Sequence, residues 1–184
     1  MGRLAVLVFV GVTMVDALTR PGFDPVRHWI SHQSLGERGW LGTAALAVTG
    51  VLLAFAAARE SGWPRRFVGL VAFALLGAAA FPIDPGLGWP PGVPAARTWV
   101  GSIHDGFGLL LVVGLIGTCV TIARRTRRFA LPVATAAVVV LAFVGCGVLA
   151  ALDFSGTWPE APSGLLERVA LYPGVAFVGL SARS

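Results

Sequence analysis

Long apolar stretches, separated by short polar segments, recur along the whole sequence. Six of them lie at residues 4–18, 40–58, 67–83, 100–123, 129–152 and 163–182. A transmembrane helix needs about 20 consecutive apolar residues to cross the hydrocarbon core of a bilayer. The pattern therefore predicts an all-α membrane protein, with a single domain over residues 1–184 built as a bundle of six transmembrane helices.

The basic residues between these stretches predict how the chain is oriented. Nine of the 14 basic residues fall at the two termini or in the second and fourth connections, and the other five lie on the opposite side. Cytoplasmic loops carry the excess of arginine and lysine in membrane proteins. We therefore expect both termini in the cytoplasm and the longer loops, residues 19–39, 84–99 and 153–162, on the outer side.

Composition supports a membrane protein and argues against a nucleic-acid-binding one. The chain is 56% hydrophobic and only 12% charged, whereas a soluble domain carries about 25% charged residues. A net charge of +5 suits phosphate binding, but the arginines form short clusters between apolar stretches, where membrane anchors lie. We expect membrane lipids as partners and no nucleic acid.

Two of the three histidines suggest a metal site on the outer side. His28 and His32 are four residues apart, so a short helix over residues 24–35 would place both rings on one face. Two imidazoles and a carboxylate can bind zinc; the alternative is a pair of surface histidines at headgroup depth. We expect no haem, because axial histidine pairs within the apolar stretches are missing, and no nucleotide, because no glycine-rich phosphate loop is present.

Polar residues at the outer ends of the third and fourth helices suggest acid–base chemistry. Asp84 follows the third helix, and His104 lies in the first turn of the fourth. The linking loop is long enough to bring them together as a general acid/base pair, with Ser31, Ser34 and Ser102 as possible hydroxyls. The alternative is capping of free N–H groups at a helix start, which we favour for Ser102 and Asp105. The candidate catalytic residues are therefore His104, Asp84 and Ser34.

Besides Asp105, three charged residues lie within apolar stretches, where charge is costly and usually faces a cavity or a partner. Asp16 is expected to reach the membrane interface. Glu167 is expected to meet His104, and Arg168 to meet Asp153 or Asp84. The alternative is a network that locks the outer ends of the helices together. The candidate ligand-binding residues are Asp24, His28, Ser31, Glu167 and Arg168.

Five segments, taken in order, resemble a known bacterial membrane family called domain of unknown function 998. They are Arg20-Pro-Gly-Phe-Asp-Pro-Val-Arg-His-Trp-Ile-Ser-His-Gln-Ser-Leu-Gly, Gly39-Trp40, Phe81-Pro-Ile-Asp-Pro, Gly101-Ser-Ile-His-Asp and Gly164-Leu-Leu-Glu-Arg. The resemblance implies a six-helix protein of the bacterial plasma membrane with no established activity. It favours Ser31, Asp84, His104, Glu167 and Arg168 as site residues. One departure is His32, where relatives are expected to carry an acidic or amide residue, and this weakens the zinc site.

Three functions are compatible with these features. The first is binding of a lipid headgroup or small polar ligand at the extracytoplasmic face, which the clustering of polar groups there favours. The second is a membrane-embedded hydrolase that acts on a lipid-like substrate through His104 and Asp84. The third is a structural or partner-binding membrane subunit. Solute transport is disfavoured, because transporters place polar residues or broken helices at the membrane midplane and these helices are apolar there.

Overall fold

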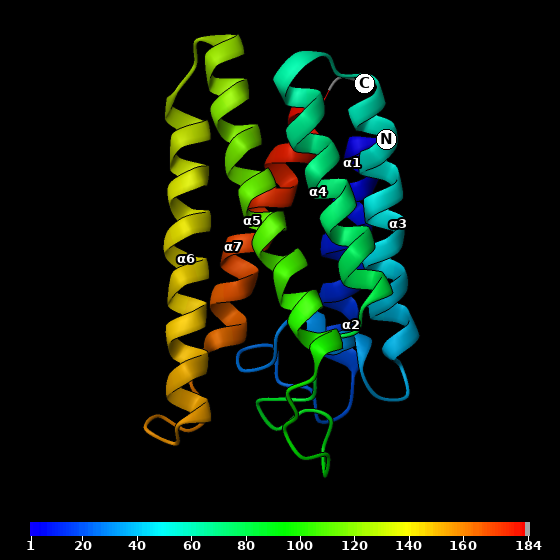
Figure 1. Cartoon of the computed structure of the whole chain (residues 1–184), viewed down its shortest axis with the longest axis vertical. Helices are drawn as coiled ribbons and strands as arrows, with labels where there is room; N and C mark the ends of the chain where they lie inside the picture. Colours follow the sequence, from blue (N-terminus) through cyan, green and yellow to red (C-terminus); the bar gives the residue numbers. More distant parts are fainter. Residues whose placement is uncertain (183–184) are drawn as a thin grey trace.

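The computed structural model describes residues 1–182 and shows a bundle of long helices (Figure 1). The first rod is continuous and consists of α1 (Gly2–Val6), the π-helical η1 (Leu7–Val12) and α2 (Thr13–Thr19). It is followed by the short 3₁₀ helix η2 (Ser31–Ser34), α3 (Gly39–Ala58), α4 (Gly62–Ala80), α5 (Trp99–Thr126), α6 (Ala130–Phe154) and α7 (Ser163–Ser181). Residues 1–182 form no β-strand.

Five helical stretches among the described residues are long and apolar enough to cross a membrane. They are Gly2–Thr19, α3, α4, α5 and α6. The chain is thus an all-helical, multi-pass membrane protein, as its sequence predicts. The remaining long helix, α7, carries Glu167 and Arg168 near its start and is not among the five, so a sixth crossing stays a prediction.

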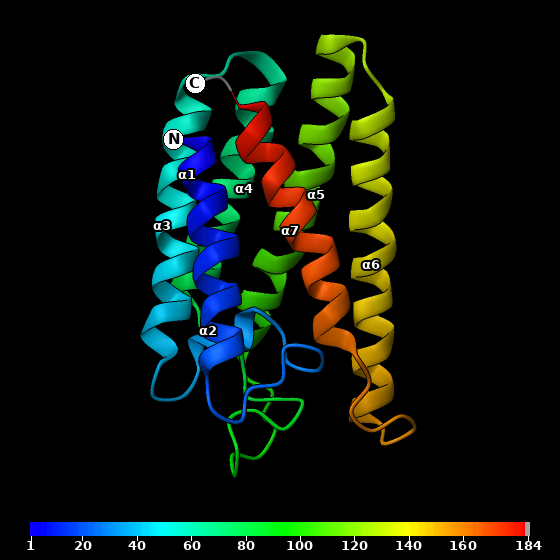
Figure 2. The ribbon, with the colours of Figure 1, turned by 180° about the vertical axis from the view of Figure 1, so that it is seen from behind.

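The helices run up and down, so that the connections separate into two ends (Figures 1 and 2). The short turns α3–α4 and α5–α6 lie near both chain termini at what we call the basic end. Residues 20–38, 81–98 and 155–162 form what we call the loop end. Eight of the nine arginines expected on the cytoplasmic side lie at the basic end, and the ninth, Arg183, is outside the described residues.

Small residues allow α4 and α5 to pack closely, as is usual between transmembrane helices. A Cβ atom placed on Gly114 would come within 2.7 Å of the Val71 side chain, and one on Gly77 within 2.2 Å of the Phe107 ring. Leu115 is fully buried in the same core. The close contact fixes α5, which carries the candidate residue His104, against α4.

Proline explains where α4 differs from its predicted bounds of 67–83. The helix begins at Gly62 because Pro64 lies in the first turn, where its missing N–H costs nothing. It ends at Ala80 because Phe81 precedes Pro82 and takes an extended conformation, with φ −112° and ψ 105°. The carbonyl groups of this last turn are therefore left for other partners.

Candidate functional site

His104 closes the end of α4 from its position on α5. Its Nδ1 atom lies 2.7 Å from the carbonyl oxygen of Phe81 and 3.1 Å from that of Ala78. Carbonyl oxygens only accept hydrogen bonds, so Nδ1 carries the proton, and Nε2 of the neutral ring is an acceptor. No hydrogen bond within residues 1–182 occupies that acceptor.

A cavity of about 220 Å³ lies beside this ring at the loop end. It is bounded by α5, α6, the first turns of α7 and the segment that carries Trp29 and Ser31. Its lining includes the polar side chains of Ser31, His104, Asp105 and Glu167. Three of these are residues that the sequence nominates for a site, and the structure brings them together around one space.

Glu167 has one carboxylate oxygen engaged and one available. Oε2 accepts a hydrogen bond from the backbone N–H of Ile30, whereas Oε1 has no partner in the part of the chain that the structure describes. The side chain is only 7% exposed and makes no ion pair with a described residue. The direct contact with His104 expected from the sequence is not formed; both side chains face the same cavity instead.

Arg168 points away from the cavity and holds the loop. Its guanidinium donates to three backbone carbonyls, including those of Pro25 and His28 at 2.7 Å each. The expected pairing with Asp153 is wrong, because Asp153 accepts two hydrogen bonds of 2.9 Å from Arg27. Arg168 therefore fixes the segment that presents Ser31 and Trp29 to the cavity.

Asp84 organises the start of α5. Its carboxylate accepts hydrogen bonds from the Thr98 backbone N–H at 2.6 Å and from the Thr98 hydroxyl at 2.7 Å. The Thr98 oxygen in turn accepts from the N–H of Gly101 and caps the helix. No hydrogen bond joins Asp84 to His104 among the described residues, so the expected acid/base pair is not formed.

Asp105 does not cap α5, although the sequence favours that role. The cap is Thr98, whose carbonyl also accepts the Ser102 hydroxyl at 2.9 Å. Asp105 makes no hydrogen bond or ion pair with any residue in 1–182 and lines both the 220 Å³ cavity and a neighbouring hollow of about 700 Å³. Asp105 therefore lines the cavity and does not cap the helix as expected.

The helix expected over residues 24–35 is absent apart from the short 3₁₀ turn Ser31–Ser34. Groups outside the segment occupy carbonyls that a helix would use: those of Val26 and Arg27 accept from the N–H groups of Leu165 and Gly164, at 2.8 and 3.1 Å. Asp24 accepts from the N–H of Val26 at 2.8 Å, and His28 Nδ1 accepts from the N–H of Asp24 at 2.9 Å. The Ser34 hydroxyl donates to the Ser31 carbonyl at 2.7 Å. Asp24, His28 and Ser34 therefore shape the loop and do not line the cavity.

The two neighbouring histidines offer poor metal geometry. Their ring centroids lie 6.4 Å apart, and the Nδ1 atom of His32 already accepts from the Trp29 N–H at 3.2 Å. Burial lowers the pKa of His32 to about 3 and also lowers that of His28. No group of three or more His, Cys, Asp or Glu within residues 1–182 is placed to hold a metal ion.

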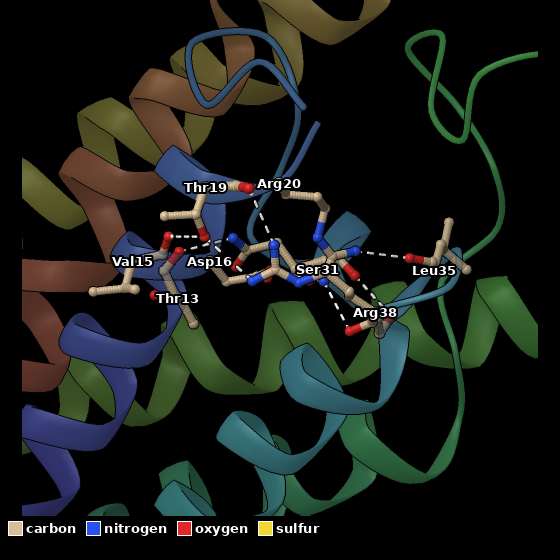
Figure 3. A network of polar contacts seen from close by, with 10 residues as sticks. Thr13, Val15, Asp16, Thr19, Arg20, Ser31, Leu35 and Arg38 are labelled. Carbon is tan, nitrogen blue, oxygen red and sulfur yellow. Dashed lines mark hydrogen bonds and ion pairs between the residues drawn. The ribbon is translucent and has the colours of Figure 1, made fainter. Parts of the chain in front are cut away.

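A buried charge network secures the other side of the same loop (Figure 3). Asp16 is 1% exposed and pairs with Arg20 at 2.7 Å and with Arg38 at 2.9 Å. Arg20 also donates to the Leu35 carbonyl at 2.8 Å. Asp16 therefore does not reach the interface as expected: it ties α2 to both ends of the loop.

The fold is that of a multi-pass helical membrane protein with a cavity at one end of its bundle. The family model described as "Protein of unknown function (DUF998)" matches residues 3–184, so the chain belongs to this family. The resemblance noted in the sequence is thereby confirmed. Comparison with curated proteins and with solved structures found no significant match.

Proposed function

We propose that this protein binds the cationic headgroup of an outer-leaflet lipid, through its ammonium group, in the cavity between α5, α6 and α7. The observation that carries the proposal is that Glu167, with one unpaired carboxylate oxygen, and His104, with a free acceptor atom, line the same cavity. Both atoms require hydrogen-bond donors, and an ammonium group supplies three.

The remaining polar groups of the cavity favour the same ligand. Asp105 adds a second carboxylate, and the Ser31 hydroxyl accepts or donates as required. A carboxylate held in a medium of low dielectric gains more from a cation than it would in water. The cavity therefore suits a donor-rich cation better than a phosphate or another anion.

The position of the cavity favours a lipid as the source of that cation. Ile83 and Phe143 supply apolar walls. Leu109 of α5 and Val144 of α6, each next in sequence to a cavity residue, are 58% and 60% exposed, as expected of side chains that face lipid. A headgroup can thus enter between α5 and α6 while its acyl chains stay in the bilayer.

The proposed setting is a bacterial plasma membrane crossed six times, with both termini in the cytoplasm. The 19 residues of α7 span about 28 Å at 1.5 Å per residue, close to the hydrocarbon thickness of about 30 Å. The arginine-rich basic end suits the cytoplasmic side. The loop end, with the cavity, would then face outward.

A lipid titration tests the proposal. Short-chain phosphatidylethanolamine is added to the full-length protein in a neutral detergent, and binding is followed as a rise in melting temperature. We expect saturable binding that falls at least about tenfold in Glu167→Gln, because a charge-assisted contact is lost. The control is Glu37→Gln, the same change at an exposed acid outside the cavity. Equal affinity in the wild type and both variants would contradict the proposal.

A hydrolase is the second candidate, and one observation favours it. The Ser31 hydroxyl and the His104 acceptor atom line the same cavity, and a histidine that accepts a proton from a serine is a nucleophile–base pair. The Phe81 and Ala78 carbonyls hold the ring in the way that Asp84 was expected to. Hydrolysis of a short-chain lipid ester that disappears in Ser31→Ala, with headgroup binding retained, would establish this activity.

A further inference from the structure

An apolar groove of about 610 Å³ runs between α4 and α5 at the basic end, far from the outer cavity. Trp63 and Phe67 form one wall, with ring centroids 6.1 Å apart, and Val120 lies on the other. Gly117 lets the walls approach, since a Cβ atom there would lie 2.1 Å from the Phe67 ring. The groove is therefore a built space between two closely packed helices.

The mouth of the groove carries positive charge that no described residue neutralises. Arg124 lines the mouth, is exposed, and makes no ion pair or hydrogen bond within residues 1–182. Its neighbour Arg125 instead pairs with Glu60 at 2.5 Å. Glu60 is the one acid among the described residues of this end, which also holds Arg3, Arg59, Arg65, Arg66, Arg127 and Arg128.

The groove extends from the membrane surface into the depth of the acyl chains. Seven residues separate Gly117 from Arg124 on α5, an axial distance of about 10 Å. At the surface, the Arg66 guanidinium lies 4.7 Å from the Trp63 ring centroid, a cation–π contact in the region where tryptophan anchors membrane proteins. An occupant must accordingly combine an anionic head with an apolar tail.

We propose that this groove binds one anionic phospholipid from the leaflet at the basic end. Its phosphate lies at Arg124, and one acyl chain follows the groove past Val120 towards Gly117. Arginine forks match phosphate oxygens, and basic pockets between transmembrane helices suit anionic headgroups. Ser61, at the start of α4, makes no side-chain cap, so free N–H groups of that helix add partial positive charge. The site is separate from the outer cavity in place and in charge.

Lipid retention measured by native mass spectrometry tests this site. The full-length protein is released from detergent after incubation with phosphatidylglycerol, or with phosphatidylcholine as the neutral comparison. We expect one retained phosphatidylglycerol, with an apparent affinity at least about tenfold lower in Arg124→Gln. The matched control is Arg128→Gln, an exposed arginine at the same end that does not line the groove; it should change affinity by less than about twofold. Equal weakening by both variants would overturn the proposal in favour of diffuse surface charge.

A second variant separates a lipid from a free anion. Val120→Trp fills the groove and keeps every charge, so it should abolish phosphatidylglycerol retention while the protein remains monodisperse in phosphatidylcholine. Inorganic phosphate at millimolar concentration should not displace the lipid. Unchanged retention in Val120→Trp, or displacement by inorganic phosphate, would show that the site takes a phosphate group and not a phospholipid.

Discussion

The Nδ1 atom of His104 lies 2.7 Å from the carbonyl oxygen of Phe81, and this contact joins the end of α4 to α5. The contact also fixes the tautomer of the ring, since a carbonyl requires Nδ1 to donate. The two ring nitrogens of His104 therefore have separate roles. Nδ1 donates to carbonyls at the end of α4, and Nε2 remains a hydrogen-bond acceptor for the cavity.

Two substitutions separate these roles. In His104→Asn, the amide nitrogen can replace Nδ1 as donor, so stability should stay close to wild type while headgroup binding falls. In His104→Ala, two buried carbonyls lose their donor, and the free energy of unfolding should fall by about 1–3 kcal/mol. Reversible unfolding in mixed micelles and the lipid titration measure the two effects. Equal loss of stability in both variants would show that the ring acts through packing alone.

Asp84 should matter for stability and little for binding. Asp84→Asn weakens the contacts that hold the cap residue Thr98 in place, and loss of a cap costs about 0.5–2 kcal/mol. Headgroup affinity should stay within about twofold, because additivity holds for groups without shared partners. A variant that folds normally but no longer binds or turns over lipid would instead place Asp84 in the site.

The Asp16 network gives a graded prediction. Asp16→Asn leaves the buried Arg20 guanidinium uncompensated, and breaking a buried pair in this way costs about 3–5 kcal/mol. The Arg38 side chain is 38% exposed, so Arg38→Gln should lower the free energy of unfolding by only about 0–1 kcal/mol. Unfolding free energies of the two variants and of Asp16→Asn/Arg20→Gln test this order. A reversed order would mean that Arg38 is the main partner.

His32 predicts a loss of stability on the acid side. Its pKa is about 3 in the folded protein because of burial, against about 6.5 in an unfolded chain. Between these values only the unfolded state binds the proton, so stability falls as pH drops below about 6.5, by about 1.4 kcal/mol per pH unit. Above pH 6.5 the contribution is constant.

Unfolding free energies at pH 7, 6 and 5 measure this slope. His32→Asn keeps an acceptor for the Trp29 N–H but does not titrate, so the slope should become shallower, with a remainder from His28. An unchanged slope in His32→Asn would assign the acid sensitivity to other groups.

The helices were predictable because a long apolar stretch that crosses a membrane must pair its own backbone groups, which a helix does. The stretch at 40–58 agrees with α3, at Gly39–Ala58, and that at 163–182 with α7, at Ser163–Ser181. Even the misplaced start of α4 followed from a rule, since Pro64 is tolerated in a first turn.

The partners of the polar side chains were not predictable, because the conformation of the loops decides which groups meet. Asp84, Asp153 and Glu167 each have several charged or polar groups within reach along the sequence. Their partners in the structure are Thr98, Arg27 and the backbone of Ile30. Backbone donors carry no sequence signal, so the choice of Ile30 was invisible before the fold was known.

The most direct test of the proposed headgroup site is a distance. Solid-state NMR dephasing between a ¹⁵N-labelled ethanolamine headgroup and ¹³C-labelled glutamate carboxyls reports whether the two lie within about 4 Å, the range of an ion pair. We predict dephasing in the wild type and in Glu37→Gln, and its loss in Glu167→Gln. Absence of dephasing in the wild type, or dephasing that persists in Glu167→Gln, would contradict an ammonium group bound in the outer cavity.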